Sequence, residues 1–149
     1  MIYTAMTKKA MKICFEAHKE QKDKTGLPYV FHPFHLAEQM NDEITATVAL
    51  LHDVAEDTDI TLENLRNEGF CDEVIDALTL LTHDPKVPYM DYVEKIKNNT
   101  VAKAVKLADL THNSDLTRFD TISDFDLKRK EKYKEAINIL QGSGVKTNE

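Results

Sequence analysis

The sequence predicts an all-α fold, a compact single-domain helical bundle, and three observations support this prediction. Glycine and proline, the residues that most strongly interrupt helices, number only four each among 149 residues. No stretch sustains the alternation of apolar and polar residues that is typical of a half-buried strand. Apolar residues recur instead at intervals of three and four, which builds one buried face of a helix. We expect one domain with its own core over residues 1–141, followed by a C-terminal tail over 142–149.

Three helices are expected in the N-terminal half, at about 7–19, 32–40 and 42–56. The apolar stripe of the first comprises Ala10, Met11, Cys14, Phe15 and His18. A histidine that continues such a stripe is better explained as a core or rim residue than as a metal ligand. A loop over 21–29 contains a glycine and a proline and leads into the second helix, which buries Phe34 or Leu36 with Ala37. The third helix is the most apolar in the chain.

Capping residues define the next helices. Thr61 is suited to cap a short helix that Gly69 closes, and Asp72 is expected to cap the helix after it. Pro88 opens another helix, since proline is favoured at a helix start. The core residues expected on these last two helices are Val74, Ile75, Leu78 and Leu81, and then Tyr89, Tyr92, Val93 and Ile96.

Two more helices complete the chain. One follows Asn98-Asn99-Thr100 and continues to about Asn113 or Leu116. The last covers about 126–140 and ends at Gly142, with Leu127, Tyr133, Ala136, Ile137 and Leu140 on its buried side. His83-Asp84-Pro85 lies between an apolar run and a proline, which predicts a loop and not a second functional His-Asp pair.

Composition excludes several classes of function. The formal net charge of −7 argues against nucleic acid as a partner, because phosphate contacts along a polymer need clustered lysines and arginines. No apolar run approaches the ~20 residues that span a bilayer, and the N-terminus lacks a signal-peptide pattern, so no membrane partner is expected. Cys14 and Cys71 form no Cys-x-x-Cys motif, and free thiols suit a cytoplasmic protein. No feature of the sequence specifies an oligomeric state.

Residues 50–58 place one imidazole and three carboxylates at the end of the most apolar helix. On a continuous helix His52 follows Val48 by one turn and Asp53 follows Ala49, so both lie on a buried stripe. A buried carboxylate without a partner takes up a proton, so something must offset its charge. A salt bridge, a hydrogen-bond network and a metal ion are the three explanations.

Two distant residues favour a metal ion. His32 stands at an expected helix start before Pro33, and Asp109 lies on the inward face expected for the 101–113 helix. Imidazole nitrogens and carboxylate oxygens suit Mn²⁺, Fe²⁺ or Zn²⁺, and four ligands leave room for water and substrate oxygens. His35 is a weaker candidate for a fifth ligand, because three residue steps turn it roughly 60° away from His32.

From about residue 17 to 113, the chain resembles the HD-domain phosphohydrolases, in particular the hydrolase domain of the RelA/SpoT family and its small stand-alone relatives. The segments that carry the resemblance are 26–33 (GLPYVFHP), 51–58 (LHDVAEDT), 106–109 (KLAD) and His112-Asn113. The resemblance implies one Mn²⁺ and removal of the 3′-pyrophosphate of guanosine 3′,5′-bis(diphosphate), a small phosphorylated nucleotide. It makes His32, His52, Asp53 and Asp109 the metal ligands and Glu56 with Asp57 the catalytic acid pair. These 149 residues leave no length for the synthetase domain of bifunctional members, so alarmone synthesis is not expected of them.

The expected substrate-binding residues are Lys22, Lys24, Thr25 and Asn113. The family pattern has arginines where this chain has Asp23, Leu110 and Asp115, and neither Asp nor Leu supplies bidentate phosphate contacts. Lys22, Lys24, Lys106 and Arg118 can compensate in part. The alternatives are therefore a hydrolase for another nucleotide and, from a different class, a catalytically silent nucleotide-sensing module.

Overall fold

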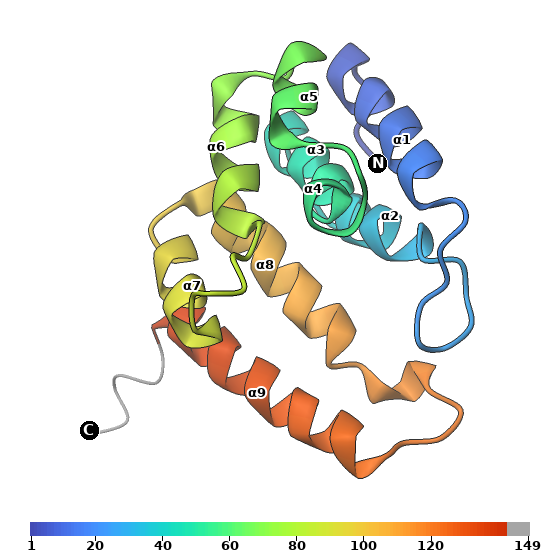
Figure 1. The fold of residues 1–149 in the computed structure, drawn as a ribbon, viewed down its shortest axis with the longest axis vertical. Coiled ribbons are helices and arrows are strands. Elements are labelled where there is room, and N and C mark those ends of the chain that lie inside the picture. Colours follow the sequence, from blue (N-terminus) through green and yellow to red (C-terminus); the bar gives the residue numbers. More distant parts are fainter. Residues whose placement is uncertain (143–149) are drawn as a thin grey trace.

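The computed structural model describes residues 1–142, and this part of the chain is an all-α bundle, as expected (Figure 1). The central helix α3 (Glu43–Leu51) packs against α1 (Ala5–His18), α2 (Phe31–Glu38), α6 (Asp72–Leu81) and α8 (Thr100–Asn113). Every residue of α3 from 45 to 51 is buried. Neighbours therefore cover this helix on all sides, which explains why its sequence is apolar without a polar stripe.

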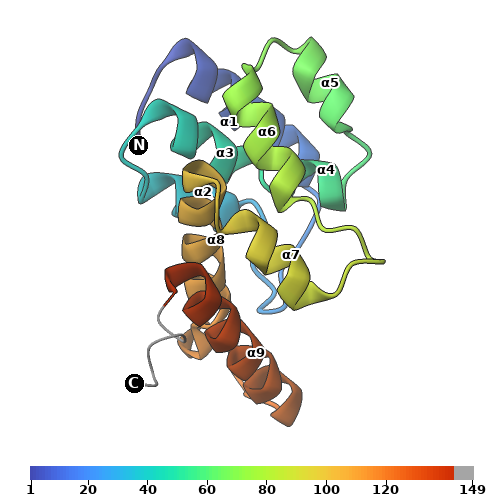
Figure 2. The same cartoon turned by 90° about the vertical axis from the view of Figure 1, so that its left-hand side faces the viewer.

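The remaining elements are α4 (Val54–Asp57), α5 (Leu62–Asn67), α7 (Tyr89–Ile96), the 3₁₀ turn η1 (Leu116–Arg118) and α9 (Asp124–Gln141). Helix α8 connects the two ends of the molecule, because it packs against α3 and α6 on one side and against α9 on the other. Figure 2 shows α9 extending from the lower end of the bundle, away from α1 and α5. Residues on α8 can therefore contact both the core and the α9 side.

The expected helix boundaries outside 42–56 are confirmed to within two residues. Thr61 caps α5 in a reciprocal capping box with Asn64, and Gly69 follows with a φ of +99°. The expected cap of α6 is wrong by one residue, since Cys71 is the N-cap and Asp72 begins the helix. The expected start of α9, at residue 126, lies two residues after the observed start at Asp124. Ser123 caps the helix, and its hydroxyl accepts a hydrogen bond from the backbone N–H of Asp126.

The expected helix over 42–56 is wrong as a single element, because the structure divides it into α3 and α4. Asp53, at the junction, has φ −106° and ψ 0°, outside the α-helical region. The His52 ring hydrogen-bonds the carbonyl of Ala49 at 2.7 Å, and the Asp53 carboxylate accepts a hydrogen bond from Tyr29. These side-chain contacts favour the turn, which changes the direction in which α4 presents its two acids.

Two residues assigned to buried stripes are instead exposed. Phe15 and Leu127 each retain 50% of their accessible surface. The buried face of α1 is narrow and follows Thr7, Ala10, Cys14 and His18, so Phe15, about 100° from Cys14, faces outward. On α9 the fully buried side chains are Ala136 and Leu140, near the end where the helix meets α7 and α8.

The loop between α1 and α2 is organised by Asp23. Its carboxylate accepts hydrogen bonds from the backbone of Thr25 at 2.8 Å and of Leu27 at 3.1 Å. Gly26 lies between them with a φ of +87°, a conformation that side chains with a Cβ disfavour. The loop therefore has a defined shape and delivers Tyr29 and His32 to the interior.

Within residues 1–142, none of the helices combines the length and apolar character that crossing a bilayer requires. The cysteines Cys14 and Cys71 are both free, the first buried and the second exposed. Gly142 ends α9 in the left-handed conformation. The rest of the tail expected over 142–149 lies outside the described residues.

Candidate metal centre and active site

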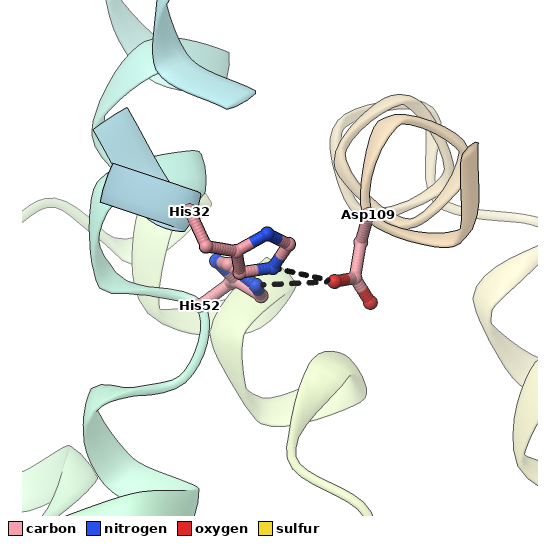
Figure 3. A group of neighbouring side chains, drawn as sticks. All are labelled: His32, His52 and Asp109. Carbon is pink, nitrogen blue, oxygen red and sulfur yellow. Dashed lines mark hydrogen bonds and ion pairs between the residues drawn. The ribbon is translucent and has the colours of Figure 1, made fainter. Parts of the chain in front are cut away.

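Three of the four predicted ligands converge from three helices. His32 lies in the first turn of α2, His52 at the C-terminus of α3, and Asp109 in α8. One ligand atom from each lies within 4.8 Å of the other two, and all three residues are buried. Figure 3 shows both imidazoles directed at the Asp109 carboxylate, with nitrogen–oxygen distances of 2.9 Å from His32 and 3.6 Å from His52.

The Nε2 atom of His52 is the best indication that a cation belongs here. It is buried and has no hydrogen-bond partner among the residues that the structure describes, although Asp53 Oδ2 lies 3.0 Å away. Burial alone would lower the pKa of His52, but the charges of Asp53 and Asp109 raise it well above the usual value. The two carboxylates therefore stabilise positive charge at this nitrogen, which a proton or a divalent ion can supply.

Asp53 lies beside this group without belonging to it. The carboxylate accepts a hydrogen bond from the Tyr29 hydroxyl and faces His52. Burial, followed by the charge of Asp53, raises the pKa of Tyr29, so the phenol stays a proton donor. Asp53 is thus held at the edge of the cluster by its contacts with Tyr29 and His52.

Asp109 is held by side chains of its own helix. Lys106 Nζ lies 3.1 Å from Oδ2, and Asn113 Nδ2 donates to Oδ1 at 3.0 Å. Burial would raise the pKa of Asp109, but the charge of Lys106, the hydrogen bond with His32 and the nearby His52 ring hold it well below its usual range. Asp109 therefore stays ionised in the interior, as a metal ligand must.

A second layer of histidines lies behind His32. The Nδ1 atom of His32 is 2.8 Å from Nδ1 of His112, and the His35 ring also packs against His112, with centroids 4.3 Å apart. His35, considered above as a fifth ligand, is thus not part of the metal-ligating group. Burial, and then the charge of Arg118, lowers the pKa of His112 to about 4, so its ring is neutral at pH 7.

The two predicted catalytic acids stand on α4, next to the cluster. Glu56 lines a cavity of about 70 Å³ together with His52, Asp53 and Lys106, and its Oε1 accepts a hydrogen bond from the backbone of His83 at 3.1 Å. Burial, then the charges of Asp53 and Glu56, raises the pKa of Asp57 to about 6. The pair therefore offers an acid that still holds its proton just below neutral pH.

Replacing Asp57 with asparagine is expected to stabilise the metal-free protein at pH 7. The folded-state pKa of about 6 lies above the unfolded value of 3.8, so ionisation disfavours the fold increasingly as pH rises from about 4 to 6. Discounted for the exposure of this side chain, the gain at pH 7 is about 1 kcal/mol, or about 3 °C in Tm. Thermal denaturation with a chelator should show a clearly smaller gain at pH 4.5; equal gains at the two pH values would contradict this account.

A larger cavity of about 280 Å³ opens beside His32. All four predicted substrate-binding residues line it, namely Lys22, Lys24, Thr25 and Asn113. Two further cations, Arg118 and Arg129, also line it, and each has a buried guanidinium nitrogen without a hydrogen-bond partner in the described part of the chain. The cavity thus concentrates positive charge in a protein whose net charge is −7.

Sequence reasoning assigned no role to Tyr29, His112 or Arg129, although the first two lie in segments that carry the family resemblance. The spacing from Asp109 could have indicated His112, which lies about one helical turn further along the chain. No local pattern marks Arg129, because only the packing of α9 against α8 brings it to the cavity. Asp23, where the RelA/SpoT pattern has an arginine, also lines this cavity, and its Oδ2 lies 3.7 Å from an Arg118 nitrogen.

No protein-family model matches the chain, but individual proteins do. Guanosine-3′,5′-bis(diphosphate) 3′-pyrophosphohydrolase MESH1 of Mus musculus is 32% identical over 144 residues, which cover 86% of this chain and 80% of the relative. A GTP pyrophosphokinase of Streptomyces coelicolor is 34% identical over 146 residues, which cover 89% of this chain. The matched region makes up only 12–16% of the length of this and two other long relatives.

A solved structure shares the fold. It belongs to a metazoan ortholog of SpoT that is described as hydrolysing ppGpp, guanosine 3′,5′-bis(diphosphate). The alignment has a TM-score of 0.76 and covers 95% of this chain and 89% of that chain, at 24% sequence identity. The helical arrangement of this chain therefore has a known three-dimensional counterpart.

Proposed function

This chain belongs to the family of guanosine-3′,5′-bis(diphosphate) 3′-pyrophosphohydrolases that includes MESH1, and we propose that it removes the 3′-pyrophosphate of ppGpp or a related alarmone. The observation that carries the proposal is the meeting of His32, His52 and Asp109 at one buried point. Relatives of matching length bear the name of this activity. The substrate is then a small phosphorylated nucleotide.

The proposed metal ligands are His32, His52, Asp53 and Asp109. Two imidazoles and two carboxylates fit Mn²⁺, with Fe²⁺ and Zn²⁺ as alternatives. The buried Nε2 of His52, which has no hydrogen-bond partner within residues 1–142 and faces two carboxylates, supports this assignment. When bound, the ion supplies Lewis-acid stabilisation of phosphate charge and makes water easier to deprotonate.

Glu56 and Asp57 are the proposed proton-transfer pair. Glu56 lines the small cavity next to His52 and Asp53, so its carboxylate is suited to accept a proton from the attacking water. Asp57, with a pKa of about 6, is suited to hold a proton and return it to a departing oxygen. A module that only senses a nucleotide has no need of such a pair, which disfavours a catalytically silent role.

The proposed substrate contacts are Lys22, Lys24, Thr25 and Asn113, all of which line the 280 Å³ cavity. The positive charges of Lys22, Lys24, Arg118 and Arg129 suit phosphate groups of the substrate that lie at a distance from the reacting centre. Asp23 in the same cavity favours a second candidate function, hydrolysis of another nucleotide such as an adenine analogue.

Two free cysteines suit a cytoplasmic location.

The proposal is tested with purified protein, Mn²⁺ and ppGpp, following pyrophosphate and phosphate separately. We expect pyrophosphate release that a chelator stops and added Mn²⁺ restores. Saturating Mn²⁺ should also raise the Tm, because a ligand that binds only the folded state stabilises it. Intact ppGpp after long incubation, with release from another nucleotide in a parallel panel, would replace the first candidate by the second. No release from any nucleotide would refute both.

A further inference from the structure

His112 reaches His32 from the side opposite Asp109. It lies near the C-terminal end of α8, and its Nδ1 is 2.8 Å from Nδ1 of His32. The two rings are almost parallel, with an interplanar angle of 11° and centroids 5.0 Å apart. The other nitrogen of His32, Nε2, is the one that faces Asp109, at 2.9 Å. His32 is therefore held at both ring nitrogens, once by the cluster and once by His112.

Two ring nitrogens 2.8 Å apart share one proton, and its position decides what His32 can do. If the proton lies on His112, a neutral His32 carries its own proton on Nε2, and this nitrogen cannot bind a cation. If the proton lies on Nδ1 of His32, Nε2 presents its lone pair to the cluster. A metal-ligating imidazole is normally fixed in the second state by an acceptor for its other N–H.

We propose that His112 is a positioning residue for the metal centre: it accepts the Nδ1 proton of His32 and so turns the bare Nε2 toward the ion. This inference rests on the proposed metal centre. His112 touches neither the ion nor the reacting atoms; it acts through His32 alone. Asp109, which faces the other ring nitrogen of His32, is also engaged by Lys106 and Asn113.

The inference separates a hydrogen-bond role from a packing role. His35 also packs on His112, at a centroid distance of 4.3 Å, but it is exposed and is not hydrogen-bonded to His32. Asparagine carries an acceptor at the same number of bonds from Cα as Nδ1 of histidine, whereas leucine fills similar space without one. His112→Asn, His112→Leu and His35→Leu therefore form a matched set.

The test is the dissociation constant for Mn²⁺, measured by titration calorimetry on each full-length variant, with the metal-free Tm recorded beside it. We expect His112→Leu to weaken binding by about 10- to 100-fold, and His112→Asn and His35→Leu to stay within about threefold of the unmodified protein. Unchanged affinity in His112→Leu, or equal weakening in His112→Asn, would overturn the inference.

Three further outcomes can be told apart. If His112→Leu does not fold, the comparison is between His112→Asn and His35→Leu. Clearly weaker Mn²⁺ binding by His112→Asn would then overturn the inference, because asparagine retains the acceptor. Absence of Mn²⁺ binding by the unmodified protein would instead remove the proposed metal centre itself. A purely structural His112 would lower the metal-free Tm in both His112 variants and leave the metal affinity unaltered.

Discussion

Replacing Asp109 with asparagine is expected to abolish Mn²⁺ binding and lower the rate of pyrophosphate release by at least about 10³-fold. Its carboxylate is the point at which His32, His52 and Lys106 meet. The amide removes the negative charge that the ion needs, and loss of several kcal/mol of metal-supplied stabilisation corresponds to this factor. The measurements are bound metal per chain and the initial rate at saturating ppGpp.

Asp115→Asn is the matched control for this prediction. Asp115 follows α8 and is exposed; it accepts hydrogen bonds from Thr117 that an asparagine oxygen can also accept. Because Asp109→Asn leaves the buried Lys106 ammonium without its partner, its Tm is expected to fall as well. His52→Ala supplies a second variant with intact Asp109. Retention of metal and activity in both site variants would show that the ion binds elsewhere.

Replacing Glu56 with glutamine is expected to lower kcat by about 10²- to 10⁴-fold while the protein still binds Mn²⁺ normally. Glutamine keeps the oxygen that accepts the hydrogen bond from the His83 backbone, so α4 should retain its place. It cannot accept a proton from water. Steady-state kinetics, with the Mn²⁺ dissociation constant measured on the same preparation, distinguish loss of proton transfer from loss of metal.

Glu63→Gln, on the exposed face of α5, makes the same chemical change away from the cluster and should leave kcat unaltered. If Glu56→Gln retained full kcat, the proton acceptor would have to be sought at Asp57. A parallel fall in metal affinity would instead mean that Glu56 belongs to the ion's own coordination. Each outcome thus assigns a different role to the carboxylate.

Local sequence was sufficient for the helices because the signals that define them act within one or two turns. The cap at Thr61, the glycines at 69 and 142 and the buried spacing of α6 each involve residues close together in the chain. The break after Leu51 was not predictable in this way. It is accompanied by a contact of Asp53 with Tyr29, a residue 24 positions away.

The site shows the same division. Residue types and order indicated His32, His52 and Asp109, since acids and imidazoles on apolar stripes need an explanation wherever they occur. They also indicated Asp53, yet its place at the edge of the group depends on how the turn between α3 and α4 is held. Sequence spacing did not show that His112, and not His35, contacts His32; packing places only one of these two rings within hydrogen-bonding distance of it.

The sequence by itself indicated an all-α fold, the side chains that we propose carry the chemistry, and the stretches on which they stand. The tertiary structure decided which of them meet: Asp109 with His32, 77 residues earlier, His112 with His32, and Arg118 with Asp23. The physical reason is the distance along the chain over which the stabilising interactions act. Helix formation follows from backbone hydrogen bonds and side-chain spacing over a few residues, whereas the partner that a buried polar group finds across the core depends on how all the helices pack together.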